Sequence, residues 1–155
     1  MKVFRIEREK YLDAALTGMG ASLSKANRWN GLNTKMVYTS ESRALATLEI
    51  SVHLDLSEDL PSDRFYLEIH IPDTINILEI NEKELPENWN AIPPTSLTQK
   101  IGNAFVTQNE AAVLKVPSSI VPNEFNYLIN PFHPDATSVK ITSFQKMDFD
   151  KRVWR

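Results

Sequence analysis

The sequence predicts a single domain of the α+β class in which strands outnumber helices. The chain has 155 residues, 42% of them hydrophobic and 24% charged, which is typical of one globular domain with a hydrophobic core. Segments that alternate with a period of two outnumber the segments with helical spacing. Several strand-like segments follow one another without an intervening helix, which disfavours a doubly wound parallel sheet.

The first part of the chain gives one strand, one short helix and a second strand. KVFRI, residues 2–6, alternates like a strand, and YLDAALTG, residues 11–18, is typical of a short helix that ends at Gly18. The polar stretch after it, up to Asn33, has no periodicity and is expected to be a loop. KMVYTS, residues 35–40, is rich in strand-forming residues.

A helix is predicted directly after this second strand, over residues 41–54. Ser40 is its expected N-cap, and Glu41 suits the positive end of the helix dipole. At about 100° per residue, four apolar side chains share one arc of this helix. They are Ala44, Leu45, Leu48 and Val52. Glu49 falls at the edge of the arc, where a carboxylate borders the core and keeps one side open.

The rest of the chain is expected to form strands around one longer helix. Leu97, Ile101 and Phe105 give residues 94–108 a helical spacing. Five further segments have strand character: 64–71, 75–80, 111–116, 125–130 and 138–144. No internal repeat, low-complexity tract or linker divides the chain, so one domain is expected over residues 1–155.

Composition excludes several function classes. The net charge is -3, from 17 Lys and Arg against 20 Asp and Glu, and no basic cluster offers a footprint for nucleic acid. No apolar run reaches the length of a signal peptide or a membrane span, so the expected location is the cytoplasm, without membrane association. Cysteine is absent, which excludes disulfides, thiolate metal sites and cysteine nucleophiles.

The sequence offers no metal motif and no glycine-rich phosphate loop. The three histidines, His53, His70 and His133, lack the spacing of metal ligands, so no metal is expected. His133 lies among turn-forming residues in NPFHPD and is expected in a turn or at the rim of a pocket. The chain has only four glycines and lacks the P-loop, dinucleotide-fold and nucleophile-elbow patterns.

Three residues are candidates for chemistry, each with a structural alternative. Glu49 at the edge of its helix suits stabilisation of a developing positive charge, or is an ordinary boundary carboxylate. Arg28 offers a planar fork to a phosphate or carboxylate, or is a surface arginine packed on Trp29. Tyr38 ends a strand, where a phenol ring can stack on a heterocycle, or is a half-buried strand aromatic.

Three separated blocks together resemble the RES domain, the toxin component of bacterial RES–Xre toxin–antitoxin systems. The blocks are RWN, then VYTSES with ALATLE, then LKVPSSIVPNEFNYLINPFHP. They stand in the family's order, with ten residues from Arg28 to Tyr38 and eleven from Tyr38 to Glu49, and the resemblance runs from Phe4 to the C-terminus. The sequence departs from the family in SKAN, where glycines often precede RWN, and in its closing element, Asp150–Arg152.

The resemblance implies an ADP-ribosyltransferase-like fold, with a central mixed or antiparallel β core flanked by helices, and NAD as the substrate. Matched residue by residue, the family's arginine, tyrosine and glutamate fall on Arg28, Tyr38 and Glu49, and its serine falls on Ser118. Cleavage of the nicotinamide–ribose bond creates an oxocarbenium-like sugar, which a nearby carboxylate stabilises. The implied roles are therefore cation stabilisation by Glu49, nicotinamide positioning by Tyr38, and contacts from Arg28 and Ser118 to phosphate and ribose.

The function that the resemblance implies is that of a toxin which degrades NAD by hydrolysis or phosphorolysis. A protein ADP-ribosyltransferase that uses the same first step is the alternative, and a non-catalytic interaction module on the same fold is the third. The resemblance also implies a cognate Xre-type antitoxin that covers the active site, and a homodimer. Whether the acceptor is water, phosphate or a protein stays open.

Overall fold

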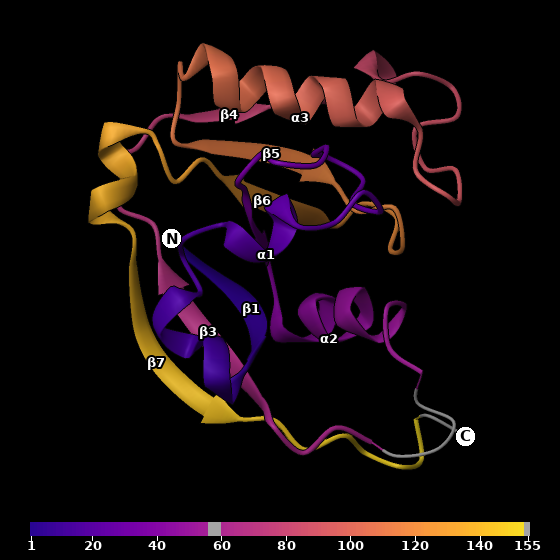
Figure 1. Ribbon diagram of the computed structural model, residues 1–155, viewed down its shortest axis with the longest axis vertical. Helices are drawn as coiled ribbons and strands as arrows, with labels where there is room; N and C mark the ends of the chain where they lie inside the picture. Colours follow the sequence, from indigo (N-terminus) through magenta and orange to yellow (C-terminus); the bar gives the residue numbers. More distant parts are fainter. Residues whose placement is uncertain (56–59, 154–155) are drawn as a thin grey trace.

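A computed structural model describes residues 1–55 and 60–153 and contains one mixed β-sheet (Figure 1). Its seven described strands lie in the order β4-β5-β6-β2-β1-β3-β7. The strands are β1 Lys2–Arg8, β2 Val37–Ser40, β3 Arg64–His70, β4 Ile77–Glu79, β5 Val113–Pro117, β6 Phe125–Ile129 and β7 Lys140–Lys146. Only β4 and β5 pair in parallel among these strands. The α+β class, with a mixed and mostly antiparallel sheet, is confirmed.

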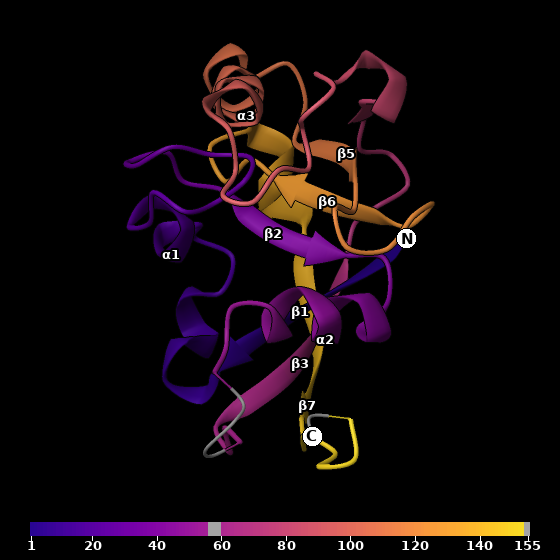
Figure 2. The same ribbon diagram turned by 90° about the vertical axis from the view of Figure 1, so that its right-hand side faces the viewer.

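Three α-helices and three 3-10 helices accompany the sheet in the described residues. The α-helices are α1 Met19–Ser22, α2 Arg43–Ser51 and α3 Ser96–Gln108, and the 3-10 helices are η1 Glu9–Ala14, η2 Glu82–Glu84 and η3 Pro134–Ser138. Figure 1 shows α3 lying along β5 at one end of the molecule, and Figure 2 shows β2 between α3 and α2. Within the described ranges, no helix has the length and apolar character needed to cross a bilayer.

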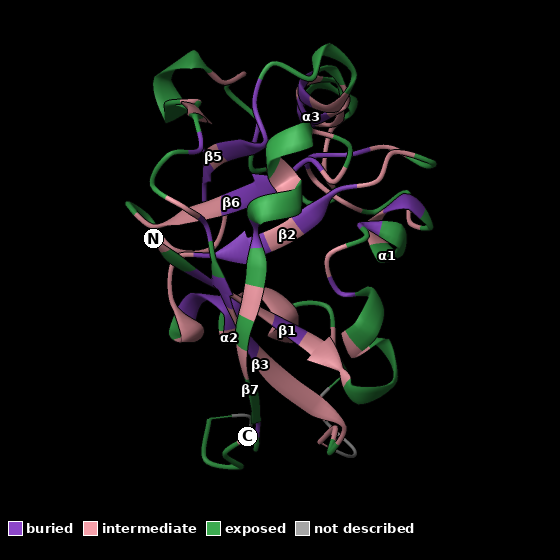
Figure 3. Ribbon diagram, turned by 90° about the vertical axis from the view of Figure 1, so that its left-hand side faces the viewer, coloured by how far each residue is buried: buried purple, intermediate pink, exposed green. Residues whose placement is uncertain are grey.

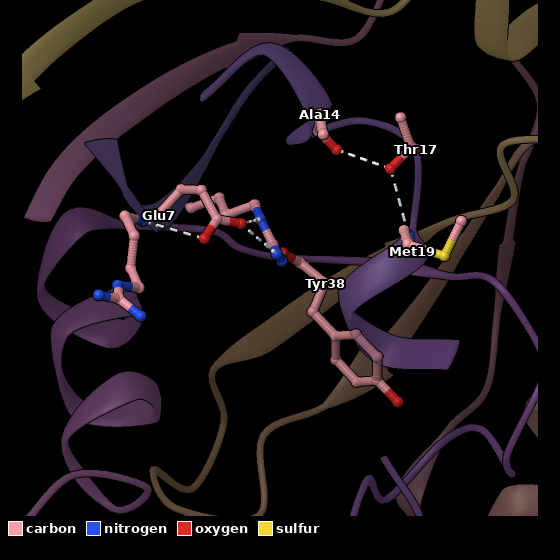
Figure 4. Close-up of polar contacts among 7 residues, drawn as sticks. Glu7, Ala14, Thr17, Met19 and Tyr38 are labelled. Atoms are coloured by element: carbon pink, nitrogen blue, oxygen red, sulfur yellow. Dashed lines mark hydrogen bonds and ion pairs between the residues drawn. The ribbon is translucent and has the colours of Figure 1, made fainter. Parts of the chain in front are cut away.

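The short helix predicted over residues 11–18 is confirmed only in its first half, because residues 11–14 lie in the 3-10 helix η1 and residues 15–17 form a turn. Thr17 Oγ1 donates to the Ala14 carbonyl over 2.7 Å, beside the Thr17 backbone amide, and accepts from Met19 N over 3.2 Å, so its hydroxyl fixes a turn here (Figure 4). Gly18 does not end a helix. It has φ +71°, where a Cβ would lie 2.6 Å from Met36 N, and it precedes α1, a short helix inside the predicted loop.

The start of α2 also differs from the prediction. Ser42, and not Ser40, is the N-cap, and its side chain accepts from Leu45 N over 3.0 Å. Glu41 lies before the helix, where its carboxylate accepts from Phe125 N over 2.9 Å. Ser40 is the last residue of β2, so the strand runs to the position that the sequence suggests for a cap.

The apolar arc predicted for this helix mostly faces outward. Leu45 and Ala46 are its buried residues, whereas Leu48 is 40% exposed and Val52, which follows the helix, is 61% exposed. The helix packs mainly on β1 and β2 and so buries a narrow face. Glu49 is half-buried, as expected for a residue at the boundary of the core.

The sheet is weakly joined between β1 and β2. β1 pairs with β3 over seven residues from Lys2 to Arg8, but it pairs with β2 only through Phe4 and Ser40. Figure 3 shows the burial concentrated in the middle of the sheet, whereas β7 is largely exposed. The sheet therefore opens beside β2, a strand that is mostly buried.

Helix α3 holds the loop that follows α1 against the sheet. Phe105 of α3 belongs to a buried cluster that includes Trp29, Leu114 and Leu128. Gly102 permits this approach, because a Cβ there would lie 1.6 Å from the Trp29 carbonyl oxygen. The loop bearing Arg28 is thus packed on a rigid element.

Candidate active site

A cavity of about 580 Å³ lies where β1 and β2 separate. Arg5 and Ile6 of β1 line one part of it, and Tyr38 and Thr39 of β2 line another. Helix α2 with the two residues after it, residues 20–21, the loop 26–29, the segments 92–94 and 119–120, and Asn126 of β6 complete the wall. This volume is in the range of small-molecule sites, roughly 300–1,000 Å³.

Arg5 bridges the two strands where their pairing ends. Its Nη1 donates to the Tyr38 carbonyl over 3.0 Å, and its Nη2 forms an ion pair with Glu7 over 2.8 Å. Figure 4 shows Glu7 beside this contact and the ring of Tyr38 pointing away from it. Arg5 is not one of the site residues predicted from the sequence, although a charged residue inside the alternating KVFRI segment was a signal.

Tyr38 fastens β2 to the loop that carries Arg28. Its hydroxyl donates to Asn30 Oδ1 over 2.7 Å and accepts from Trp29 N over 3.1 Å. Burial raises the pKa of Tyr38 far above its ordinary value, although the Trp29 amide and Arg28 oppose this. The phenol is therefore neutral, and Tyr38 lines the cavity.

Asn30 is the support beneath this contact. It is fully buried, and its Nδ2 donates to the carbonyls of Ala21, Gly31 and Thr34. Through these bonds the Asn30 side chain holds together three parts of the backbone between residues 21 and 34. This loop therefore has a defined shape without regular secondary structure. Asn30 stands in the RWN block, but sequence reasoning assigned it no role.

Arg28 enters the cavity half-buried. Its Nη1 donates to the carbonyls of Trp89 over 2.7 Å and Ala91 over 3.1 Å, while Nε and Nη2 donate to no described residue. Burial lowers the pKa of Arg28, and the Glu49 carboxylate opposes that shift. Trp29 is 2% exposed and lies in the core, so Arg28 is not a surface arginine packed on it.

Glu49 faces the cavity from α2 and is held by one of its two oxygens. Oε1 accepts from Ser118 Oγ over 3.0 Å and from Asn126 Nδ2 over 2.6 Å. Oε2 has no hydrogen bond to a described residue, and Glu49 lines the cavity. The carboxylate is thus oriented, with one oxygen left for a ligand.

Ser118 lies behind Glu49. It is 6% exposed and is not one of the described residues that line the cavity. Its Oγ accepts from Ile120 N and Val121 N, both over 3.1 Å, and its proton goes to Glu49. The hydroxyl that the resemblance assigns to phosphate or ribose is therefore bound to the carboxylate.

Two histidines sit in different surroundings. His53 is exposed and lines the cavity. His133 lies in a turn, as expected, and its Nδ1 accepts from Asp135 N over 3.1 Å at the start of η3. Among the described residues, no group of three or more His, Cys, Asp or Glu side chains is arranged to hold a metal ion.

The three residues predicted from the sequence to carry the chemistry lie around one cavity. Arg28, Tyr38 and Glu49 all line the cavity, although they come from a loop, a strand and a helix. Arg28 and Glu49 interact electrostatically without a salt bridge between them. A cation for an anionic group and a carboxylate for a developing cation are therefore available in the same cavity.

Comparison with known proteins identifies the family and the fold. Residues 2–150 match the family described as RES domain. The chain is 39% identical to the Prs ADP-ribosylating toxin of Sphingobium sp. over 90% of its own length and 87% of that protein. It is 37% identical to Toxin Res of Photorhabdus laumondii over 96% of its length and 93% of that protein.

A solved structure shares the architecture. A chain in the crystal structure of the M. tuberculosis MbcT–MbcA toxin–antitoxin complex superposes with a TM-score of 0.74 at 14% identity. The match covers 94% of this chain and 83% of that one. The ADP-ribosyltransferase-like fold expected from the sequence is confirmed by this likeness.

Proposed function

The chain belongs to the RES domain family, and we propose that it is the toxin of a toxin–antitoxin system that cleaves the nicotinamide–ribose bond of NAD. The observation that carries this proposal is the Glu49 carboxylate, which lines the cavity, is fixed through Oε1 and has no hydrogen bond from a described residue at Oε2. A carboxylate held next to the ribose stabilises the oxocarbenium-like transition state more than the ground state. Degradation of NAD would then inhibit growth.

The other two residues supply binding and orientation. Arg28 has two donor nitrogens without a described partner, which suits the charged pyrophosphate. The hydroxyl of Tyr38 is occupied by Asn30 and Trp29, so its ring is the part that can hold nicotinamide by stacking. Nicotinamide leaves as a neutral molecule from a cationic substrate, so orientation matters more than a strong acid.

Ser118 contributes through Glu49. Its single proton is directed at Oε1, so we assign it to positioning the carboxylate. A direct contact between Ser118 and ribose or phosphate would need this hydrogen bond to be exchanged.

Transfer of ADP-ribose to a protein is the second candidate. The observation that favours it is the 39% identity to a protein named an ADP-ribosylating toxin. Both activities share the bond cleavage and differ only in the acceptor. Retention of the fold without catalysis is the third candidate, and it predicts NAD binding without turnover, or no binding.

A cognate antitoxin is the expected partner. The structural relative was solved as a toxin–antitoxin complex. For this chain we propose an Xre-type antitoxin that covers the cavity, with a homodimeric toxin acting in the cytoplasm.

Product analysis tests the proposal. Purified protein is incubated with NAD, with and without inorganic phosphate, and the adenosine-containing products are separated and weighed by mass spectrometry. Free ADP-ribose indicates hydrolysis, phosphorylated ADP-ribose indicates phosphorolysis, and ADP-ribose attached to protein in a bacterial extract indicates a transferase. Intact NAD in every reaction would contradict both enzyme proposals.

A further inference from the structure

A directed chain of hydrogen bonds runs from β2 through β6 to Glu49. Ser40 Oγ donates to Asn126 Oδ1 over 2.8 Å, and Asn126 Nδ2 donates to Glu49 Oε1 over 2.6 Å. Ser40 and Asn126 are direct partners in the pairing of β2 with β6. The side chain that orients the carboxylate is thus mounted on the middle of the sheet, while the carboxylate itself stands on α2.

The direction of each bond follows from the available donors. Because Asn126 Oδ1 accepts from Ser40, the amide must present its NH₂ group to Glu49. Ser118 Oγ already accepts two backbone amides, so it too meets Glu49 as a donor. Oε1 is therefore committed to two donors, and substrate contact falls to Oε2.

Ser40 also stands at the opening of the sheet. It is 4% exposed and forms the one Cα pairing of β2 with β1, opposite Phe4. The bond from Ser40 thus anchors Asn126 where the cavity begins. Without it, the amide could turn its oxygen toward Glu49, and two acceptors would face each other.

We propose that Asn126, oriented by Ser40, is a positioning residue that restricts the reaction to Oε2 of Glu49. The inference rests on the proposed function, since it concerns the carboxylate assigned to the ribose cation. Neither residue was a candidate from the sequence. Asn126 is present in the FNYLIN strand, but its partners are decided by tertiary structure.

The variant Asn126→Asp gives the proposal a pH signature. With one shared proton, the new carboxyl group donates to Glu49 as the amide does, so activity is retained at low pH. As the pH rises, that proton is lost and two carboxylates face each other, so Glu49 is displaced. We expect a descending limb of kcat between about pH 5 and about pH 9, which the wild type lacks.

Other titratable side chains around Glu49 must be separated from this effect. They line the cavity and are Arg5, Arg28, Tyr38 and His53. Arginine stays charged and tyrosine stays neutral over most of this range, and His53 is the described cavity side chain that a second substitution removes. The limb should persist in the double variant Asn126→Asp with His53→Asn.

Two further variants complete the kinetic test. Asn126→Ala should lower kcat about a hundredfold at every pH, with a smaller change in KM for NAD. Ser40→Ala should also lower kcat, but by less. Without Ser40 the Asn126 amide can adopt two orientations, and one of them still presents the NH₂ group to Glu49. A wild-type kcat in Asn126→Ala would overturn the proposal.

Thermal unfolding separates failure of this inference from failure of the proposed function. In Asn126→Asp the folded pair retains a proton that the unfolded chain releases, so stability is present at low pH and is lost as the pH rises. The melting temperature of Asn126→Asp should therefore fall relative to wild type between about pH 5 and about pH 9 even if no NAD is cleaved. If the melting temperature and kcat of Asn126→Asp change with pH in the same way as those of the wild type, Asn126 does not hold Glu49.

Discussion

The hydroxyl of Tyr38 donates to Asn30 Oδ1 over 2.7 Å and thereby joins the wall of the cavity to the loop that carries Arg28. Tyr38→Phe should remove this bond while keeping the ring. The loss leaves a buried amide oxygen and the Trp29 amide without that partner, which costs about 1–3 kcal/mol. Chemical denaturation measures the change, with Tyr127→Phe as the control, because Tyr127 is buried and its hydroxyl has no hydrogen bond to a described residue. Equal stability of the two variants would contradict the structural role.

Alkaline titration tests the buried phenol directly. Burial raises the pKa of Tyr38 above the ordinary value of 10.0, so the neutral phenol stabilises the fold below that value. This contribution is lost as the pH rises beyond it, because the unfolded chain then ionises first. We expect a part of the tyrosinate absorbance to appear only with unfolding, and to be smaller by one tyrosine in Tyr38→Phe, where Tyr127, whose pKa burial also raises, still contributes. Ionisation of all four tyrosines before unfolding would contradict the burial.

Glycine 102 is a sharp test of how α3 supports the Arg28 loop. In Gly102→Ala the added Cβ would meet the Trp29 carbonyl at 1.6 Å, so the helix and the loop must separate. We expect destabilisation of about 2–4 kcal/mol and weaker NAD binding. Gly20→Ala is the matched control, since nothing lies within 4 Å of its added Cβ. Urea unfolding measures the free energy of unfolding of both variants. Comparable values would contradict the close packing of α3 on the Arg28 loop.

The fork of Arg28 is the feature that lysine cannot reproduce. Arg28 uses Nη1 for the carbonyls of Trp89 and Ala91 and leaves two nitrogens for an anion. A lysine keeps the charge but cannot make both sets of contacts, so the Kd for NAD should rise about tenfold or more. Calorimetric titration measures this, with Arg8→Lys as the control, because Arg8 pairs with Asp63 and is not one of the described cavity residues. An unchanged Kd in Arg28→Lys would refute the anion contact.

Sequence patterns predicted the strands and α3 because alternation and helical spacing are local. They failed for α2, where the predicted arc assumed that every apolar side chain faces the core. In the structure this helix meets only part of the sheet, and Leu48 is left exposed. The cap was misplaced by two residues because Ser40 is recruited by β2 and Asn126.

Part of the site could be predicted from the sequence, because the spacing of residues along the chain is also a local property. Arg28, Tyr38 and Glu49 stand at a fixed spacing in the chain, and the fold brings them to one cavity. Arg5 and Asn126 were missed because their roles depend on partners distant in sequence, such as the 77 positions that separate Asn126 from Glu49. Hydrogen-bond partners of that kind follow from strand order and register, which no local pattern encodes. The partners of Asn30 lie within nine positions, but the loop that brings them together has no periodic pattern.

The central claim is that Glu49 drives cleavage of NAD through one free oxygen, and nicotinamide release by wild type and Glu49→Gln tests it most directly. The amide oxygen can take the place of Oε1 toward Ser118 and Asn126, so the variant should fold and bind NAD. We predict release by wild type and by the exposed-site control Glu110→Gln, and a loss of about a thousandfold or more in Glu49→Gln. Release by a folded Glu49→Gln at the wild-type rate would contradict the account.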